Sequence, residues 1–284
     1  MDAGLDATAH GADHQTGVTP EASEENRMAR RYRLTLALAA ALIVLGVGAG
    51  ALKVTPPDQE QQVAELRSIG GTVFERDGIV VEVNLNRTRV TDEDLGRLSG
   101  FNAMTDLSLE ETAIGDDGLR RLSGLKTLVW LNLYRTRAGD DGLAHLKGLN
   151  RLEHLPLGET RVTDAGLIHL RGLRRLSYLG LRGDRITDAG LRHVGELTGL
   201  TGLHLGRTDI SDRGLVCLKP LVRLKTLWLN DTHITDAAIP TLAGLDTLDE
   251  LHVLRTDLTI EGVRRLKRLR PACRIYYRSE QEPE

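Results

Sequence analysis

Histidine and tryptophan recur in this sequence at a spacing that could support metal or ring chemistry. His204, Trp228 and His252 follow one another at equal intervals along the chain. Imidazole is a frequent metal ligand, and strands that carried these residues side by side would lie about 4.8 Å apart. The two histidine backbones would then be roughly 10 Å apart with the indole between them, and the pattern offers no third ligand. We therefore expect no metal site and no cofactor.

Motifs for catalysis are absent from the sequence. It contains no nucleophile elbow, phosphate loop or HExxH, and no Cys/His pair that its repeats would bring together. Its two cysteines, Cys217 and Cys273, are too few for a disulfide framework or a four-thiolate zinc site. They are expected to be free thiols, and no catalytic residue is predicted. An enzyme with an unrecognised site is the alternative.

One tract dominates the chain. Val-Thr-Asp-x-x-Leu begins at Val90, and related copies follow at a constant interval of 24 residues, without an insertion, from Ile114, Ala138, Val162, Ile186, Ile210, Ile234 and Leu258. Eight copies explain why leucine supplies 50 of the 284 residues although only 3% are aromatic. A strict period of this length is typical of a solenoid, in which stacked units bury one continuous core.

Each period contains two patterns. A pair of apolar residues separated by one spacer, such as Leu131 and Leu133, predicts a short strand with one face inward. Leucines three apart after the Thr-Asp, such as Leu119 and Leu122, predict a short helix, with the Thr or Ser as its N-cap.

These units resemble leucine-rich repeats of the form LxxLxLxxN, as the copy from Leu176 to Leu191 illustrates. The Thr-Asp-x-Gly-Leu half resembles the cysteine-containing subfamily known from F-box proteins and abundant in bacteria. The resemblance implies an α/β fold, a right-handed solenoid or horseshoe with a parallel concave sheet and short convex helices. The sequence departs from the subfamily at the position that should be Asn or Cys. We expect the residues there to form a structural ladder from repeat to repeat: Thr88, Thr112, Thr136, Thr160, Asp184, Thr208, Thr232 and Thr256.

The concave face is where such a solenoid would bind a partner. Both tryptophans fall in its outward columns, and exposed aromatic residues with arginine are typical of interface hot spots. An alternative is that large residues only fill this face. The predicted contact set is Trp130, Tyr134, His154, Tyr178, Arg182, His204, Trp228 and His252.

A membrane anchor is predicted before the repeats. The stretch 34–52 carries no charge, and as a helix it would span about 28 Å of a bilayer. Arginines precede it, and only Lys53 follows closely. By the positive-inside rule the N-terminus is cytoplasmic and the repeats are outside, in the periplasm or at the cell surface. A cleaved signal peptide is the alternative, because Ala49-Gly50-Ala51 resembles a processing site.

The predicted organisation has five parts. Residues 1–33 form a disordered tail, 34–54 the transmembrane helix, 55–79 a linker and N-terminal cap, 80–271 the eight repeats, and 272–284 a cap strand and tail. A helix over 57–69 and a hairpin around Asp77-Gly78 are expected in the first cap. A basic run from Arg264 to Arg278 closes the array, as a solvated face or as a contact for an acidic surface.

The functional expectation is recognition of an unidentified protein or other macromolecule, without catalysis. A formal net charge of -3 gives no reason to expect a nucleic-acid partner. The alternatives are an F-box-like substrate adaptor and a glycan-binding protein of the cell envelope.

Overall fold

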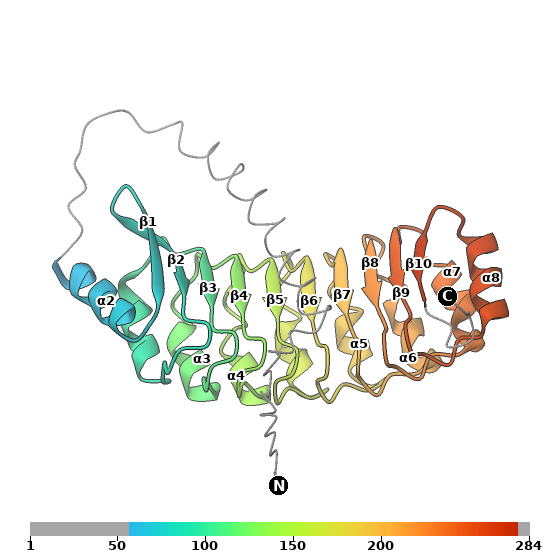
Figure 1. Ribbon diagram of the computed structural model, residues 1–284, viewed down its shortest axis with the longest axis horizontal. Coiled ribbons are helices and arrows are strands. Elements are labelled where there is room, and N and C mark those ends of the chain that lie inside the picture. The colour runs from blue at the N-terminus through green and yellow to red at the C-terminus, as the bar shows by residue number, and fades with distance from the viewer. Residues whose placement is uncertain (1–56, 278–284) are drawn as a thin grey trace, which may run out of the picture. The chain divides into compact units, whose positions relative to one another are not determined.

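The computed structural model describes residues 57–277, whose strands form one sheet in chain order from β1 to β10 (Figure 1). β1 and β2 form an antiparallel hairpin, and every later neighbour is parallel. The strands are β1 Thr72–Arg76, β2 Ile79–Asn84, β3 Asp106–Ser108, β4 Trp130–Asn132, β5 His154–Pro156, β6 Tyr178–Gly180, β7 Gly202–His204, β8 Thr226–Trp228, β9 Glu250–His252 and β10 Arg274–Tyr276.

Within the repeats, the short helices lie on the side of the solenoid opposite the sheet (Figure 1). The α-helices are α2 Pro57–Ser68, α3 Asp116–Leu122, α4 Asp140–Ala144, α5 Leu191–Val194, α6 Asp212–Leu215, α7 Ile239–Ala243 and α8 Ile260–Leu269. Tighter 3-10 turns take their place or extend them: η2 Asp94–Gly100, η3 Gly166–Leu170, η4 Val216–Leu218 and η5 Asp236–Ala238. The predicted helix of each repeat is therefore a helical turn of varying tightness, because only about one turn is available between two loops.

Paired residues of neighbouring strands occupy the same position in successive repeats. Leu107 of β3 pairs with Leu131 of β4, and Leu203 of β7 pairs with Leu227 of β8, so each partner stands one repeat further along the chain. These leucines point inward and are fully buried. The central residue of a three-residue strand therefore always faces the core, and its two neighbours face outward.

Aspartates of the Thr-Asp motif connect one repeat to the next. Asp188 accepts hydrogen bonds from both the backbone N–H (2.7 Å) and the hydroxyl (2.6 Å) of Ser211 in the following repeat. The same pair of bonds joins Asp140, Asp164, Asp212 and Asp236 to the residue 23 positions later. Gly214 of the motif is small because Asp188 lies where its Cβ would be. The carboxylates are structural, and they act across the repeat boundary.

The predicted ladder of threonines runs within repeats. The Thr136 hydroxyl donates to the Leu133 carbonyl three residues earlier, and the same bond is made by Thr88, Thr112, Thr208, Thr232 and Thr256. Between repeats, Asp184 accepts from the backbone N–H and the hydroxyl of Thr160. The hydroxyls at this position therefore bond the carbonyl of their own tight turn, and the contact from one repeat to the next is made by Asp184.

Caps close both ends of the described region. Val63 and Leu66 of α2 are buried, and Gln59 donates to the Gly100 carbonyl of η2 at 2.8 Å. The hairpin β1–β2 and the closing strand β10 complete the expected caps. None of the helices within residues 57–277 is long and apolar enough to cross a bilayer. The predicted span at 34–52 lies outside the described residues.

Candidate functional site

The eight predicted contact residues share the outward side of the sheet, here called the sheet face. Six of them lie within β4 to β9, and Tyr134 and Arg182 follow β4 and β6 by two residues. The fold brings them into one continuous group, because consecutive members lie on strands that pair with each other.

Burial of these side chains corrects the prediction that they are exposed. All eight are only 3 to 7% accessible. The interpretation of this face as a set of projecting hot-spot side chains was therefore wrong, and large residues do fill it.

Ring stacking accounts for much of this burial. The Trp228 ring lies between His204 and His252, with centroid distances of 5.4 and 5.3 Å and interplanar angles of 9° and 21°. Tyr276 of β10 stacks on His252 at 4.3 Å. Strands about 4.8 Å apart place consecutive side chains of a column close to stacking distance.

A second group of rings continues the first toward the N-terminus. The ring centroids of Trp130 and His154 are 5.1 Å apart, and those of His154 and Tyr178 are 6.4 Å apart. The edge of Tyr178 then meets Trp228 at 6.3 Å. Ring contacts thus extend from β4 to β10.

Glycines beside the rings allow them to lie along the sheet. An added Cβ on Gly202 would come within 3.0 Å of the Tyr178 ring, and one on Gly206 within 2.9 Å of the His204 ring. A Cβ added at Gly158 would lie 3.3 Å from the Tyr134 ring. A ring next to glycine covers backbone that would otherwise be exposed.

A metal is not supported by the placement of the histidines. The Trp228 ring stands between His204 and His252, as the spacing predicted. Among residues 57–277, no cluster of three or more His, Cys, Asp or Glu side chains could hold a metal ion.

The buried histidines are neutral at physiological pH. Burial lowers the pKa of His204 to about 3, with a smaller contribution from the positive charge of Arg182 and from His252. Burial likewise lowers the pKa of His154 and of His252 to about 4. Desolvation penalises the imidazolium, so these rings act as flat, uncharged packing groups.

A charged column borders the sheet face, and it was missed at the sequence level. In every repeat the residue just before the Thr88-type position has a left-handed backbone, with φ between 53° and 73°. The residues are Arg87, Glu111, Arg135, Glu159, Gly183, Arg207, Asp231 and Arg255. Arginine and glutamate rarely adopt this conformation. From Arg87 to Asp231, the backbone N–H of each of these residues donates to a carbonyl of the next repeat, which holds the left-handed conformation in place.

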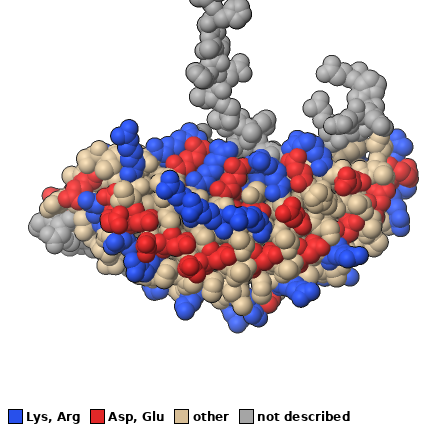
Figure 2. Space-filling view, turned by 90° about the horizontal axis from the view of Figure 1, so that it is seen from below, with Lys and Arg blue, Asp and Glu red and all other residues tan. Residues whose placement is uncertain are grey.

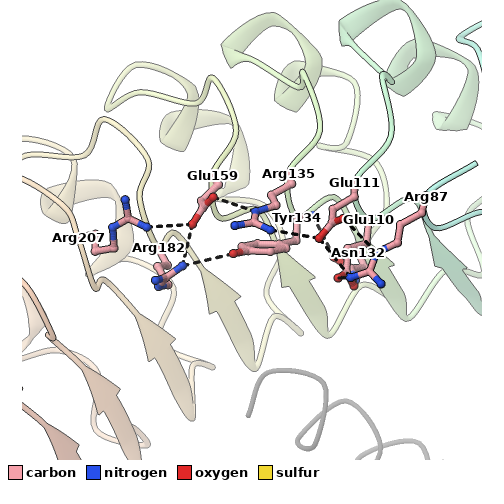
Figure 3. A network of polar contacts seen from close by, with 9 residues as sticks. All are labelled: Arg87, Glu110, Glu111, Asn132, Tyr134, Arg135, Glu159, Arg182 and Arg207. Carbon is pink, nitrogen blue, oxygen red and sulfur yellow. Dashed lines mark hydrogen bonds and ion pairs between the residues drawn. The ribbon is translucent and has the colours of Figure 1, made fainter. Parts of the chain in front are cut away.

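The first four members form an alternating ion-pair ladder (Figure 3). Glu111 accepts from Arg87 at 3.0 Å and from Arg135 at 3.2 Å. Arg135 also donates to Glu159 at 2.9 Å. Burial raises the pKa of the Glu111 carboxyl, but the hydrogen bonds and charges of the two arginines outweigh it and leave that pKa lowered.

At Gly183 the alternation fails. Arg182, the residue before it, and Arg207, one repeat later, both donate to Oε1 of Glu159, at 2.7 and 3.2 Å (Figure 3). Arg182 also donates to the Tyr134 hydroxyl at 3.3 Å, which connects the ladder to a second residue of the sheet face. Comparing the residue at this one position across all repeats would have revealed the charge pattern in the sequence.

The surface seen from below Figure 1 carries both signs of charge. Lys and Arg are interspersed with Asp and Glu along the length of the domain (Figure 2). Such a mixed surface lacks the extended basic stripe that a polyanion binder presents.

Comparisons with known proteins support the fold. No family model and no curated protein matches the sequence. Among solved structures, internalin C2 from Listeria monocytogenes is similar over 78% of this chain and 93% of its own, with a TM-score of 0.56 and 24% identity. The LRR ectodomain of the receptor kinase GASSHO1/SCHENGEN3 from Arabidopsis thaliana, in complex with CASPARIAN STRIP INTEGRITY FACTOR 2, is similar over 80% of this chain and 27% of its own, with a TM-score of 0.51 and 15% identity. The predicted leucine-rich repeat solenoid is thereby confirmed as the fold. The F-box-type subfamily stays a prediction.

The neutral state of His204 predicts how stability depends on pH. The folded pKa of about 3 lies below the unfolded value of about 6.5, so the stability is fully present above pH 6.5 and falls as the pH drops from 6.5 toward 3. Between these two pKa values, each unit of falling pH lowers the free energy of unfolding by about 1.4 kcal/mol for a fully buried histidine. We expect His204→Gln to lose less unfolding free energy between pH 7 and 5 than the wild type, measured by urea unfolding followed by circular dichroism.

The matched control is His233→Gln, because His233 is exposed. This variant should follow the wild-type pH dependence. A His204→Gln curve parallel to the wild type would show that the native state does not exclude the proton from His204.

Proposed function

We propose that this chain is a membrane-anchored leucine-rich repeat protein that recognises a protein partner through its sheet face, without catalysis of its own. The observation that carries the proposal is the concentration of rings on this face. The only two tryptophans of the sequence, Trp130 and Trp228, both lie in it, in a chain with 3% aromatic residues.

The layout of this face suits a rigid interface. Its floor is a stack of buried rings whose side chains are already ordered, so binding would cost little side-chain entropy. Its edge carries half-exposed arginines, including Arg135 and Arg207, whose side chains are 41 and 52% accessible. An ordered aromatic floor with a polar rim is the usual composition of a protein interface.

Stacked rings favour a polypeptide over a glycan. Sugar recognition would use open aromatic faces, whereas both faces of Trp228 are occupied by His204 and His252. The plant ectodomain similar to this chain was solved with CASPARIAN STRIP INTEGRITY FACTOR 2 bound. By analogy of fold alone, a protein ligand is the natural first candidate.

Membrane anchoring is the second part of the proposal. It rests on the uncharged stretch 34–52 and the arginines before it. These features favour a cytoplasmic N-terminus and repeats in the periplasm or at the cell surface. This orientation also disfavours the F-box-like adaptor, which would act in the cytosol.

Photo-crosslinking from two matched positions tests recognition. A photoreactive phenylalanine analogue would replace Thr226 on the sheet face or Val222, an exposed loop residue just before β8. In native envelopes we expect a specific adduct from position 226 and none from 222, with unchanged thermal unfolding of both variants. An adduct from 222 alone would place the partner elsewhere and contradict the proposal.

Protease treatment of intact spheroplasts tests orientation. With an epitope tag at each end, we expect external protease to remove the C-terminal tag and spare the N-terminal one. Opening the membrane with detergent should expose both tags and serves as the control. The reverse pattern in intact cells would show that the repeats lie in the cytoplasm.

A further inference from the structure

We propose that the edge of the solenoid at which its strands begin lies against anionic lipid headgroups, through a row of exposed arginine and lysine side chains. The proposal rests on the membrane anchoring of the proposed function and names a second contact of the chain with the same membrane. Three features support it: the position of these cations, their exposure, and the short segment between the domain and the predicted span.

The parallel order of β2 to β10 gives the solenoid two distinct edges. All turns that precede these strands lie at one edge, the strand-start edge, and all turns that follow them lie at the other. The turn between β1 and β2 is at the top of Figure 1, so the strands from β2 onward begin at the upper edge. The mixed surface of Figure 2, seen from below, is therefore the edge at which the strands end.

Basic residues gather at the strand-start edge, in the turns before β5, β6 and β8. Turns 171–177 and 219–225 each contain three basic residues and no Asp or Glu. Six exposed side chains, here called the basic edge, are Arg151, Arg174, Arg175, Lys219, Arg223 and Lys225. The turns stack on one another, because the N–H of Ser177 donates to the Glu153 carbonyl one repeat earlier, and that of Lys225 to Thr201. Strands about 4.8 Å apart thus set these cations in one row.

Nearby carboxylates do not neutralise this row. Glu196, in the turn before β7, is paired with Arg171, and Asp246, in the turn before β9, is paired with Arg270. Within residues 57–277, no member of the basic edge forms an ion pair. Their charges are therefore available to an anionic surface, whereas most arginines of the ladder already hold a carboxylate.

An exposed apolar side chain lies within the same row. Val222 is 68% exposed and stands between Lys219 and Arg223 in the turn before β8. At a bilayer surface, an apolar side chain enters the boundary of the headgroups and acyl chains while neighbouring cations stay at the phosphates. A nucleic-acid duplex would satisfy the cations but would offer Val222 no apolar environment. The combination favours a lipid surface.

Few residues separate the domain from the predicted span. That span is predicted to end at residue 54, and α2 begins at Pro57. A tether this short keeps the domain at a high effective concentration at the bilayer surface. Each Lys or Arg close to an anionic surface strengthens binding by about fivefold. Weak individual contacts along the basic edge therefore add up to a stable one once the domain is tethered.

Quenching by lipid headgroups tests the contact in the full chain. Cys217→Ser first removes the more exposed of the two thiols. Thr198→Cys then carries a dye in the exposed turn before β7, at the strand-start edge, and Ala113→Cys carries the same dye in an exposed turn after β3, at the other edge. Each labelled chain is reconstituted in phosphatidylcholine bilayers, with or without phosphatidylglycerol, that contain a lipid with a spin-labelled headgroup.

We expect phosphatidylglycerol to increase the quenching of the dye at position 198 but not at position 113. The triple change Arg151→Gln, Arg174→Gln and Arg175→Gln should reduce this increase at least about threefold, because it removes half of the basic edge. The matched control, Arg137→Gln, Arg161→Gln and Arg185→Gln, removes three exposed arginines from the other edge and should retain it. Thermal unfolding checks that all variants fold.

Two results would overturn the proposal. Equal quenching of the two dyes in anionic bilayers would show that the strand-start edge does not face the lipid. Equal losses from the two triple changes would indicate nonspecific attraction between charges. A DNA duplex bound through the basic edge, without any increase in quenching at position 198, would assign this edge to a polyanion instead and would also reject the lipid contact.

This outcome is separable from that of the proposed function. Retention of the chain in the bilayer after a carbonate wash reports on the anchor alone. A chain that washes off would reject the anchoring, while the quenching measured before the wash still reports on the basic edge. Retention without a difference between the dyes would reject only the edge contact, and the crosslinks from position 226 require no anionic lipid.

Discussion

Each strand from β3 to β9 is three residues long and satisfies its backbone with the strand one repeat away. Just beyond the strands the same pairing continues: the N–H of Arg87 donates to the carbonyl of Glu110, and that of Glu111 to Tyr134. A strand this short has no independent stability, so each strand depends on pairing with the strands one repeat before and after it. Carboxylates such as Asp188 enforce the same register on the opposite turn. The constant repeat length keeps the strands and these turns in the same register along the array.

The sheet face follows from this constraint. Identical registers place side chains of one column at the strand spacing, where rings stack and opposite charges pair. His204, Trp228 and His252 meet for this reason, and so do Glu111 and Arg135. Arg182 of the same face hydrogen-bonds both Tyr134 and Glu159. A partner would meet a surface whose side chains are already held in place.

Much of the fold could be predicted from the sequence, because period and polarity decide it. The inward leucines, the parallel order of the strands and both caps follow from patterns that local physics makes unambiguous. The positions of the ring residues were also predictable. Their burial was not, since a ring such as that of Tyr178 lies against Gly202 on the neighbouring strand, which a residue-by-residue list does not connect.

The direction of side-chain hydrogen bonds was also beyond the sequence pattern. A threonine such as Thr136 can bond its own turn or the next repeat, and only geometry decides between them. The ladder from Arg87 to Arg255 was predictable in principle, because its charges alternate at the repeat spacing. It was missed because its position carries no apolar signal and because arginine is not expected at positive φ.

Fluorescence of the two tryptophans tests the central claim, that the sheet face is a preformed recognition surface, most directly. Trp130 and Trp228 are the only indoles in the chain, and both are nearly buried in that face. Acrylamide quenching of the full chain would be measured alone and with the envelope protein identified by crosslinking. We expect acrylamide to quench the free chain little, and partner binding to change both the emission and the quenching of the tryptophans. Saturable binding that leaves both tryptophan signals unchanged would contradict it.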